Sequence, residues 1–307
     1  MGIEKLLFVT RFQDLSFDDL KPLLELRKAG LNHIVFLNVI ESEKVRLQRG
    51  VGFKKSEAVR LKEMANVRFI DWAETLFEQG MEVGVYIVVG NVVQQVVKSA
   101  KNEDVDLIVM GHQPKTRLQA LYTGVDISEI LERTRTPVLI HKEPPAPLQT
   151  DMHPFQRPLL ATAWSRASLH AVEFLKPIGP VIEEIHILHV ADKDTLNSDS
   201  AMSVQQTRKV TRKKLNEICA QFTSIDVSAK GHVHIGDPVK EIEQAAQEQH
   251  ASMVALGMSR RAGWQERWMG SIPRTLMDRL SIPVLIVPTD EKAESLSIRK
   301  DNVPNVG

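Results

Sequence analysis

Small and hydroxyl-bearing residues follow an apolar, strand-like run in the second half of the chain, in an arrangement suited to holding an anion. The run ends at Gly257, and Gly270 and Ser271 follow further along. Gly270 lets the backbone approach a ligand closely, while Ser271 can cap the next helix and present its hydroxyl. The free amides at the start of that helix attract negative charge, and the guanidinium of Arg260 adds to the attraction. This pattern predicts a phosphate-binding loop.

The loop differs from the common phosphate-binding signatures. A Walker loop needs Gly-Lys-Ser/Thr and a dinucleotide fingerprint needs Gly-x-Gly-x-x-Gly, and the chain contains neither. It also contains no Gly-x-Ser-x-Gly elbow and no paired-carboxylate motif of the kind that hydrolases use. The loop therefore favours ligand binding over a familiar catalytic mechanism.

Other polar and aromatic candidates are interpreted as structural. His232 and His234 alternate on a strand-like run, which could begin a metal site, but they have no cysteine or clear carboxylate beside them. Cys219 falls on the apolar face of a helical pattern and is expected in the core. Trp264 and Trp268 have i,i+4 spacing, which suits packing against their own domain and also suits a ligand lid or partner surface.

The chain contains an internal repeat. Gly90, Gly111, Gly124 and Pro137 recur at Gly236, Gly257, Gly270 and Pro283, each 146 positions later. Around them, Asp106-Leu-Ile-Val-Met-Gly111 matches Ser252-Met-Val-Ala-Leu-Gly257. Nearer the start the offset is 151 or 152, pairing Leu37-Asn-Val39 with Leu188-His-Val190 and Thr10 with Thr162. Two copies of one domain are indicated.

Each copy alternates strands with helices. Short runs rich in Val, Ile and Leu predict strands that are buried on both faces. They are Leu6–Thr10, Ile34–Val39, Val83–Val89, Leu107–Met110 and Val138–Ile140 in copy one, and Leu159–Thr162, Ile185–Val190, Ile225–Gly231, Met253–Leu256 and Val284–Val287 in copy two. Helices are expected from near Ser16, across 54–79, after Asn91 and from Asp126. The alternation predicts an α/β fold with two doubly wound parallel sheets.

The boundaries follow from composition. Residues 1–142 are expected to form the first domain, the proline-rich segment 143–157 a linker, residues 158–288 the second domain, and residues 289–307 a poorly ordered tail.

Both halves resemble universal stress protein domains, and together they resemble tandem members of that family. The resemblance rests on the Asp106–Gly111 segment, the glycine spacing and the closing Pro-Val-Leu-Ile strand. It implies five-stranded parallel sheets of order 3-2-1-4-5, paired within the chain through Val138–Ile140 and Val284–Val287. It also implies ATP or AMP as ligand, held in copy two by residues around the strand ends. These are Ala163, Val190, Gly257, Ser259, Arg260, Gly270 and Ser271.

The two copies depart unequally from the family's nucleotide-binding pattern of Gly-x-x-Gly, nine residues and Gly-Ser/Thr. Copy two keeps Gly257, Gly270 and Ser271 but has Arg260 at the second glycine. Copy one has Pro114 there and Val125 in place of the hydroxyl. Ala163 and, in copy one, Arg11 stand where the family has an aspartate. Copy two is therefore the expected nucleotide site.

Charge limits the partners. Lys plus Arg and Asp plus Glu are 39 each, and residues 1–150 carry 20 of each sign, so neither nucleic acid nor anionic membrane is an expected partner. The absence of a leader pattern predicts a cytoplasmic protein.

The sequence leaves three hypotheses for the function. The chain could be a non-enzymatic stress-response protein that binds a small ligand or a protein partner, a slow ATPase or adenylate enzyme at copy two, or a scaffold that uses residues 41–79. Intramolecular pairing of the domains allows further assembly into a homodimer.

Overall fold

The computed structural model describes residues 2–10, 15–42, 55–111, 127–142, 153–191, 201–259 and 271–289. Each half contributes five strands in these ranges. They are β1 (Lys5–Val9), β2 (His33–Glu41), β3 (Glu82–Gly90), β4 (Leu107–Gly111) and β5 (Val138–His141) in the first half. In the second half they are β6 (Pro158–Ala161), β7 (Glu184–Ala191), β8 (Ser228–Ile235), β9 (Met253–Ser259) and β10 (Val284–Thr289).

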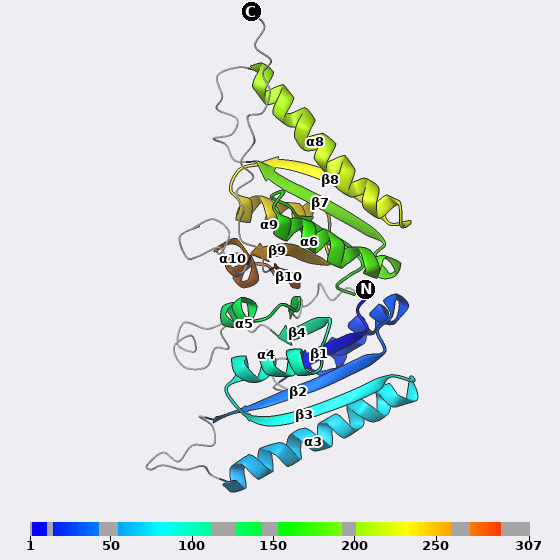
Figure 1. Cartoon of the computed structure of the whole chain (residues 1–307), viewed down its shortest axis with the longest axis vertical. Helices are drawn as coiled ribbons and strands as arrows, with labels where there is room; N and C mark the ends of the chain where they lie inside the picture. The colour runs from blue at the N-terminus through cyan, green and yellow to red at the C-terminus, as the bar shows by residue number, and fades with distance from the viewer. Residues whose placement is uncertain are drawn as a thin grey trace, which may run out of the picture.

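The strands form one continuous sheet in the order β3-β2-β1-β4-β5-β10-β9-β6-β7-β8 (Figure 1). Pairing is parallel within each half, whereas β5 and β10 pair antiparallel, with Leu139 opposite Leu285. Each half therefore has the order 3-2-1-4-5, and the two halves meet through their last strands. The predicted α/β fold and the predicted pairing within the chain are confirmed.

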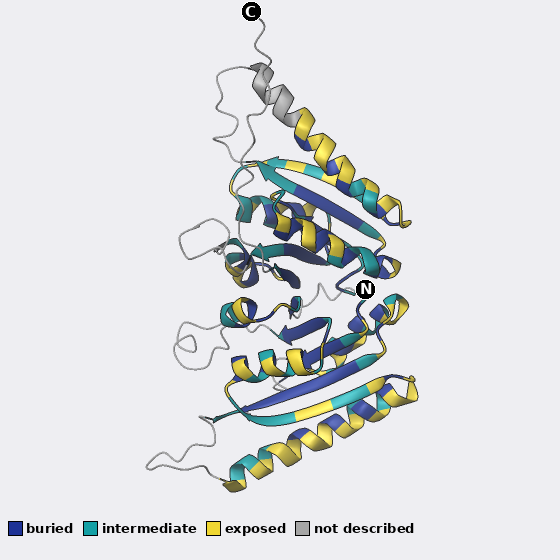
Figure 2. Cartoon of the chain, viewed as in Figure 1, coloured by how far each residue is buried: buried dark blue, intermediate teal, exposed yellow. Residues whose placement is uncertain are grey.

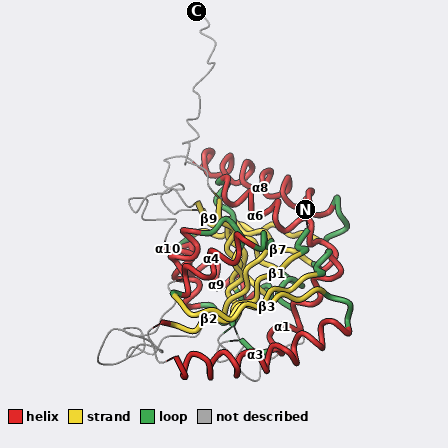
Figure 3. Tube along the Cα trace, turned by 60° about the horizontal axis from the view of Figure 1, so that its bottom comes forward, coloured by secondary structure: helices red, strands yellow, loops and turns green. Residues whose placement is uncertain are grey.

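Helices cover both faces of this sheet (Figure 3). One face carries α1 (Phe17–Leu20), the 3-10 helix η1 (Lys21–Ala29), α3 (Lys55–Glu78), α6 (Arg166–Leu175), the 3-10 helix η3 (Lys176–Val181) and α8 (Ala201–Thr223). The other carries α4 (Val92–Asn102), α5 (Ile127–Arg133), α9 (Pro238–Glu248) and α10 (Ser271–Arg279). A separate apolar cluster fills the space on each face, so the central strands are buried on both sides (Figure 2).

Local signals explain where several helices begin. Asn91 caps α4 by accepting a hydrogen bond from the amide of Gln94 (3.0 Å), and Ser165 caps α6 through the amide of Ser168 (3.2 Å). Asp126, where the sequence predicts a helix start, lies outside the described residues, and α5 begins at Ile127. The predicted helices are thus found close to their expected starts.

The start of the fourth strand is tied to the first strand in both halves. Asp106 accepts hydrogen bonds from the amides of Glu4 and Lys5, both at 2.9 Å. The matching residue, Ser252, accepts one from the amide of Arg157 at 2.8 Å. The first residue of the repeated Asp106–Gly111 segment therefore has a structural task, which is to align two neighbouring strands.

One predicted strand is displaced. The apolar pattern placed a strand at Ile225–Gly231, whereas β8 runs from Ser228 to Ile235. The preceding helix α8 continues to Thr223, and the chain then reverses through Asp226, whose φ is 61°. Ile225 is 39% exposed in this turn. Apolar content alone could not separate a turn residue from the strand that follows it.

The end of the predicted linker is packed against the protein. Phe155 lies in a turn and is 1% exposed, although the sequence placed it in the segment 143–157. Residues 143–152 of that segment and the tail from 290 lie outside the described residues.

Within the described ranges, every helix is too short or too polar to cross a membrane.

Candidate functional site

The carboxyl ends of β6 and β9 form the switch point of the second domain. β6 leads into α6 on one face of the sheet, while the chain after β9 reaches α10 on the other face. Ligands of open α/β sheets bind where neighbouring connections diverge in this way. The candidate site is therefore the edge formed by the ends of β6, β7 and β9.

Thr162, directly after β6, is held in place from β7. Its amide donates to the carbonyl of Leu188 (2.8 Å), and Nδ1–H of His189 donates to its carbonyl (2.9 Å). Because a carbonyl can only accept, this contact places a proton on Nδ1 of His189. The hydroxyl of Thr162 donates to Ser168 in α6 (3.2 Å), so the start of the loop is fixed to two elements, β7 and α6.

Trp164 folds back over this arrangement. Its indole Nε1 donates to Nε2 of His189 (3.3 Å), and the two rings lie 4.6 Å apart at an angle of 36°. His189 therefore donates through one ring nitrogen and accepts through the other, which only the neutral imidazole can do. Burial lowers the pKa of His189 below its ordinary value of 6.5, and the nearby Lys214 ammonium lowers this pKa further.

Two further features mark Trp164. Its backbone has φ of 58°, a left-handed conformation that is uncommon for a bulky residue. The ammonium of Lys214, from α8, lies 5.5 Å from the centre of the indole ring. A cation at this distance from an aromatic face is attracted to it. The indole thus contacts both His189 and Lys214.

The first domain repeats the hydrogen bonds that hold the threonine after the first strand. The amide of Thr10 donates to Leu37 (3.0 Å), and the side-chain amide of Asn38 donates to the Thr10 carbonyl (2.8 Å). Asn38 and His189 therefore do the same work in the two halves, and Thr10 is the structural equivalent of Thr162. The sequence pairing of these residues is confirmed. Residues 11–14, which follow Thr10, lie outside the described residues.

The predicted site residues fall into two groups. Ala163 is exposed, and Val190, Gly257 and Ser259 are partly exposed; all four lie at the carboxyl ends of neighbouring strands, as expected. Ser271 is the first residue of α10, but its side chain is not described. Arg260 and Gly270 lie outside the described residues, as do Trp264 and Trp268.

Gly257 has a packing role of its own. A Cβ at this position would lie 1.9 Å from the carbonyl oxygen of Ala167 in α6. No side chain fits into that space, because real Cβ atoms do not approach a backbone oxygen so closely. The glycine is therefore required for the contact between β9 and α6, whatever ligand the edge binds.

The two domains differ in how open this edge is. In domain one, Asn38, Val39 and Ile40 are buried at the end of β2. Their equivalents in domain two, at the end of β7, are all partly exposed: His189, Val190 and Ala191. The second domain thus presents more of its strand ends to solvent.

Sequence reasoning missed Trp164 and Lys214. The indole follows an apolar strand by two residues, which gives it no periodic signal, and Lys214 is 50 positions away on α8. Only the packing of α8 against this edge brings the two together. The Ser165 cap, in contrast, has an ordinary signature, a serine directly before a helical pattern.

His232 and His234, which the sequence raised as metal candidates, have other partners. Nδ1 of His186 lies 3.0 Å from Nε2 of His232, whereas His234 pairs with Glu241 of α9 at 3.0 Å. His232 and His234 therefore do not converge on a common point. Within the described ranges, no three His, Cys, Asp or Glu side chains are grouped as a metal ion would require.

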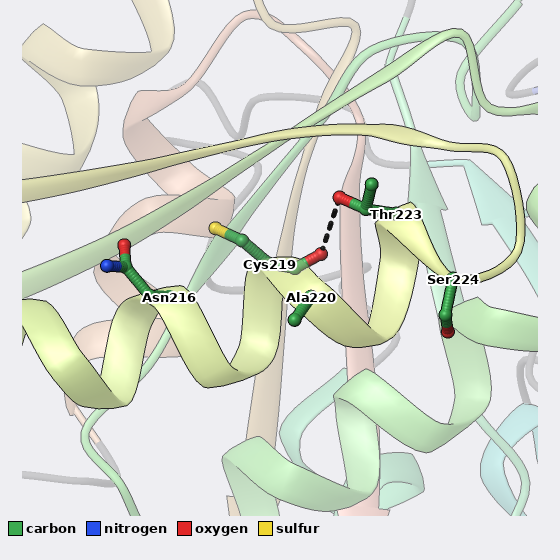
Figure 4. Close-up of a pocket in the computed structure, with 5 residues that line it drawn as sticks. All are labelled: Asn216, Cys219, Ala220, Thr223 and Ser224. Carbon is green, nitrogen blue, oxygen red and sulfur yellow. Dashed lines mark hydrogen bonds between the residues drawn. The ribbon is translucent and has the colours of Figure 1, made fainter.

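Cys219 lies on α8, beside an open pocket lined by Asn216, Cys219, Ala220, Thr223 and Ser224 (Figure 4). The thiol is half-buried, and its burial raises the pKa of Cys219 above its usual value, which keeps it protonated. Thr223 donates to the Cys219 carbonyl (3.0 Å) and so serves the helix itself. The predicted core face is confirmed for its neighbours Leu215, Ile218 and Phe222, which are buried.

Comparison with known proteins identifies the relatives of the whole chain. The sequence model of the universal stress protein family matches residues 5–142 and again residues 155–288. Universal stress protein MJ0577 of Methanocaldococcus jannaschii is 26% identical over 153 residues, which is 45% of this chain and 94% of that protein.

Solved structures show the same fold over almost the entire length. A universal stress protein from Archaeoglobus fulgidus superimposes with a TM-score of 0.67 at 21% identity, covering 92% of this chain and 96% of that one. A putative universal stress protein from Pseudomonas aeruginosa gives a TM-score of 0.61 at 20% identity, covering 93% of each chain. At these identities the likeness concerns the fold alone.

Proposed function

The chain belongs to the universal stress protein family, and from that premise we propose that it is a non-enzymatic, cytoplasmic stress-response protein whose second domain binds an adenine nucleotide. The proposed ligand is ATP or AMP, and the proposed site is the carboxyl edge of β6, β7 and β9. Occupied and empty forms of the protein would report the cell's energy state to a partner. Such a report requires the partner to have different affinities for the two forms.

One observation carries this proposal: the edge of the second domain is open where that of the first is closed. Val190 and Ala191 are partly exposed, whereas Val39 and Ile40 are only 4% and 6% exposed. Ala163 is exposed beside them. A base and a ribose need apolar surface together with backbone groups, and these residues supply both. The sequence supports the same half, because it retains Gly270 and Ser271 in the phosphate-binding pattern.

Calorimetric titration of ligand-free protein with ATP and magnesium tests the proposal. Denaturing extraction first shows whether nucleotide was carried through purification. We expect about one site per chain with Kd near micromolar, which corresponds to about −8 kcal/mol. No binding heat from demonstrably empty protein would contradict the proposal.

Paired variants assign the site to a half. Gly270→Val places a branched side chain at the proposed phosphate approach and should abolish binding, while Gly124→Val, its counterpart, should leave it unchanged. Both positions lie outside the described residues, so this pair tests the sequence pattern. Equal loss in both variants would refute the asymmetry between the halves. Ala163→Asp, which introduces the carboxylate that the family carries here, should tighten binding.

The same sample distinguishes binding from turnover. Under the alternative of a slow ATPase, phosphate would appear in proportion to protein and would disappear with Gly270→Val. Under the present proposal, bound nucleotide is recovered unchanged after incubation.

A scaffold role is a second candidate, favoured by one surface. The outer side of α3 is exposed along its length (Figure 2), and several of its exposed residues are large and apolar. They are Val59, Met64, Val67, Ile70 and Phe77, between 46% and 62% exposed. Exposed apolar patches on soluble proteins often mark interaction sites. Val67→Glu combined with Phe77→Glu should abolish recovery of a protein partner without altering ATP affinity if this surface is used.

A further inference from the structure

We propose that Trp164 is a built-in latch on the second domain's site, closed while His189 is neutral and released when His189 takes up a proton. This inference rests on the proposed function, because it assigns a regulation to the same site. The latch itself is defined by contacts within the chain, and it can be observed without any ligand.

The closed position is set by the two nitrogens of one imidazole. Nδ1–H of His189 is committed to the carbonyl of Thr162 (2.9 Å), which leaves Nε2 as an acceptor for the Trp164 indole (3.3 Å). A proton added to Nε2 would point at the indole N–H, so the hydrogen bond would be replaced by a donor facing a donor. Protonation therefore removes the contact that holds the indole in place.

The groups around His189 favour its neutral form. From α8, the ammonium of Lys214 disfavours a second positive charge. Burial is the largest cause that lowers the pKa of His189, and it outweighs the hydrogen bond to the Thr162 carbonyl at the end of β6, which raises this pKa. Trp164 contributes a neutral ring. From β8, the residue paired with His189 is Val233, which carries no charge. When the indole is released, water reaches the imidazole of His189, and the protonated form of the ring becomes less unfavourable.

Proton linkage sets the direction of the effect. The pKa of His189 in the closed form lies below its ordinary value of 6.5. The closed form therefore binds fewer protons than a form with the ring in water, and the released population rises as pH falls through and below that ordinary value. The left-handed backbone of Trp164, with φ of 58°, also disfavours the closed form, because bulky residues rarely adopt it.

Release has two consequences for a ligand. The indole covers His189, whose ring lies 4.6 Å away, so it covers one of the polar side chains at the strand ends. A ligand that uses this side chain must first displace the indole. Lys214 then loses its contact with the ring and is available to an anionic group. The latch therefore couples acidity to the binding of an anionic, aromatic ligand such as a nucleotide.

The latch can be observed through the indole N–H itself. The chain has four tryptophans, and Trp164→Phe identifies the Trp164 indole signal in the NMR spectrum of the nitrogen-15-labelled protein. In the wild type we expect this proton to be protected at pH 8 and unprotected at pH 5, each judged relative to the intrinsic rate of indole exchange at that pH. The change should follow the titration of His189.

His189→Asn is the matched control because Asn38 already occupies the equivalent place in the first domain. The asparagine can donate to the Thr162 carbonyl and does not titrate, so the indole signal should be the same at pH 8 and pH 5. Should His189→Asn fold poorly, His189→Gln removes the same titration. The wild-type measurement stands without either variant.

Calorimetry with ATP and magnesium at pH 7.5 and pH 5.5 links the latch to the site. Wild-type affinity should rise several-fold at the lower pH relative to His189→Asn, which corrects for titration of ATP itself. Trp164→Ala should bind ATP at pH 7.5 more tightly than the wild type.

The outcomes separate the two proposals. An indole that responds to His189 in a protein that binds no ATP at either pH would leave the latch standing and overturn the nucleotide function. An indole signal that is unchanged from pH 8 to pH 5, or that changes equally in His189→Asn, would overturn the latch whether or not ATP binds.

Discussion

Asn38 and His189 hold equivalent positions in the two halves of the chain, and each donates a hydrogen bond to the carbonyl of the threonine that directly follows the first strand, at 2.8 and 2.9 Å. In the closed edge of domain one, where Asn38 is 7% exposed, the side chain that donates this bond is an amide, which does not titrate. The imidazole has a second nitrogen, which binds Trp164. The exchange of asparagine for histidine thus separates a contact with a purely structural role from one that can respond to pH.

Removal of the Asn38 side chain should destabilise the protein. Asn38→Ala removes the hydrogen bond that the Asn38 amide donates to the Thr10 carbonyl in a buried place, which costs about 1–3 kcal/mol. We expect a lower midpoint in urea unfolding. His189→Asn, which preserves the equivalent bond, should shift the midpoint much less. A larger loss from His189→Asn would show that the two positions are not equivalent.

Gly257→Ala should be among the most damaging small substitutions. The new Cβ would lie 1.9 Å from the Ala167 carbonyl oxygen, so β9 and α6 would have to separate, at a cost of about 3 kcal/mol or more. Gly84→Ala provides the control, since its Cβ would meet Val35 at an ordinary 3.5 Å. Thermal unfolding of both variants decides the matter. Equal Tm values would mean that the β9–α6 contact tolerates a side chain.

The pair formed by Asp19 and His141 should make stability depend on acidity. Their atoms Oδ1 and Nε2 are 3.0 Å apart, and Asp19 also accepts from the amide of Ser16 at 2.6 Å. Burial on its own would raise the pKa of Asp19, but these hydrogen bonds lower it to about 2 from 3.8.

Because the folded-state pKa is the lower one, the stabilisation is complete above about pH 4 and is lost as pH falls through 2. Asp19→Asn should cost about 2 kcal/mol at pH 7 and progressively less toward pH 2. Urea unfolding at several pH values measures this difference. A cost that does not vary with pH would contradict the assignment.

Lys142 should make the free energy of unfolding depend on pH in the alkaline range. This side chain, 8% exposed at the end of the first domain, donates to the carbonyls of Met277 and Leu280 at the end of α10 in the second. Loss of water around the ammonium lowers the pKa of Lys142 to about 8 from 10.5, an effect that Asp278 partly offsets.

Between these two values the unfolded chain binds more protons than the folded protein, so the free energy of unfolding should rise with pH, by up to about 3 kcal/mol. Lys142→Met should lack this rise. Lys142→Met should also weaken the contact between the two domains, because the carbonyls of Met277 and Leu280 lose the Lys142 donor. Chemical unfolding of both proteins at pH 7.5 and pH 10 measures the effect. Parallel behaviour of the two would refute it.

The sequence by itself determined the fold, because the information is local and repeated. Runs of Val, Ile and Leu at regular intervals predict parallel strands, and the 146-residue displacement from Gly90 to Gly236 predicts two copies. It also identified Thr10 and Thr162 as equivalent residues of the two copies. The pairing of Val138–Ile140 with Val284–Val287 was implied by the resemblance to the family. Where a turn carried apolar residues, as at Ile225, the same local reasoning misplaced the start of β8.

Only the tertiary structure decided which side chains meet at the strand ends. Trp164, His189 and Lys214 come from three elements that are far apart along the chain, and their contacts depend on how α8 packs across the end of β7. The same holds for Lys142, whose partners lie 135 and 138 positions away in the other domain. Periodicity specifies which face of an element is buried, but it carries no distance between elements, and these contacts are distances of that kind.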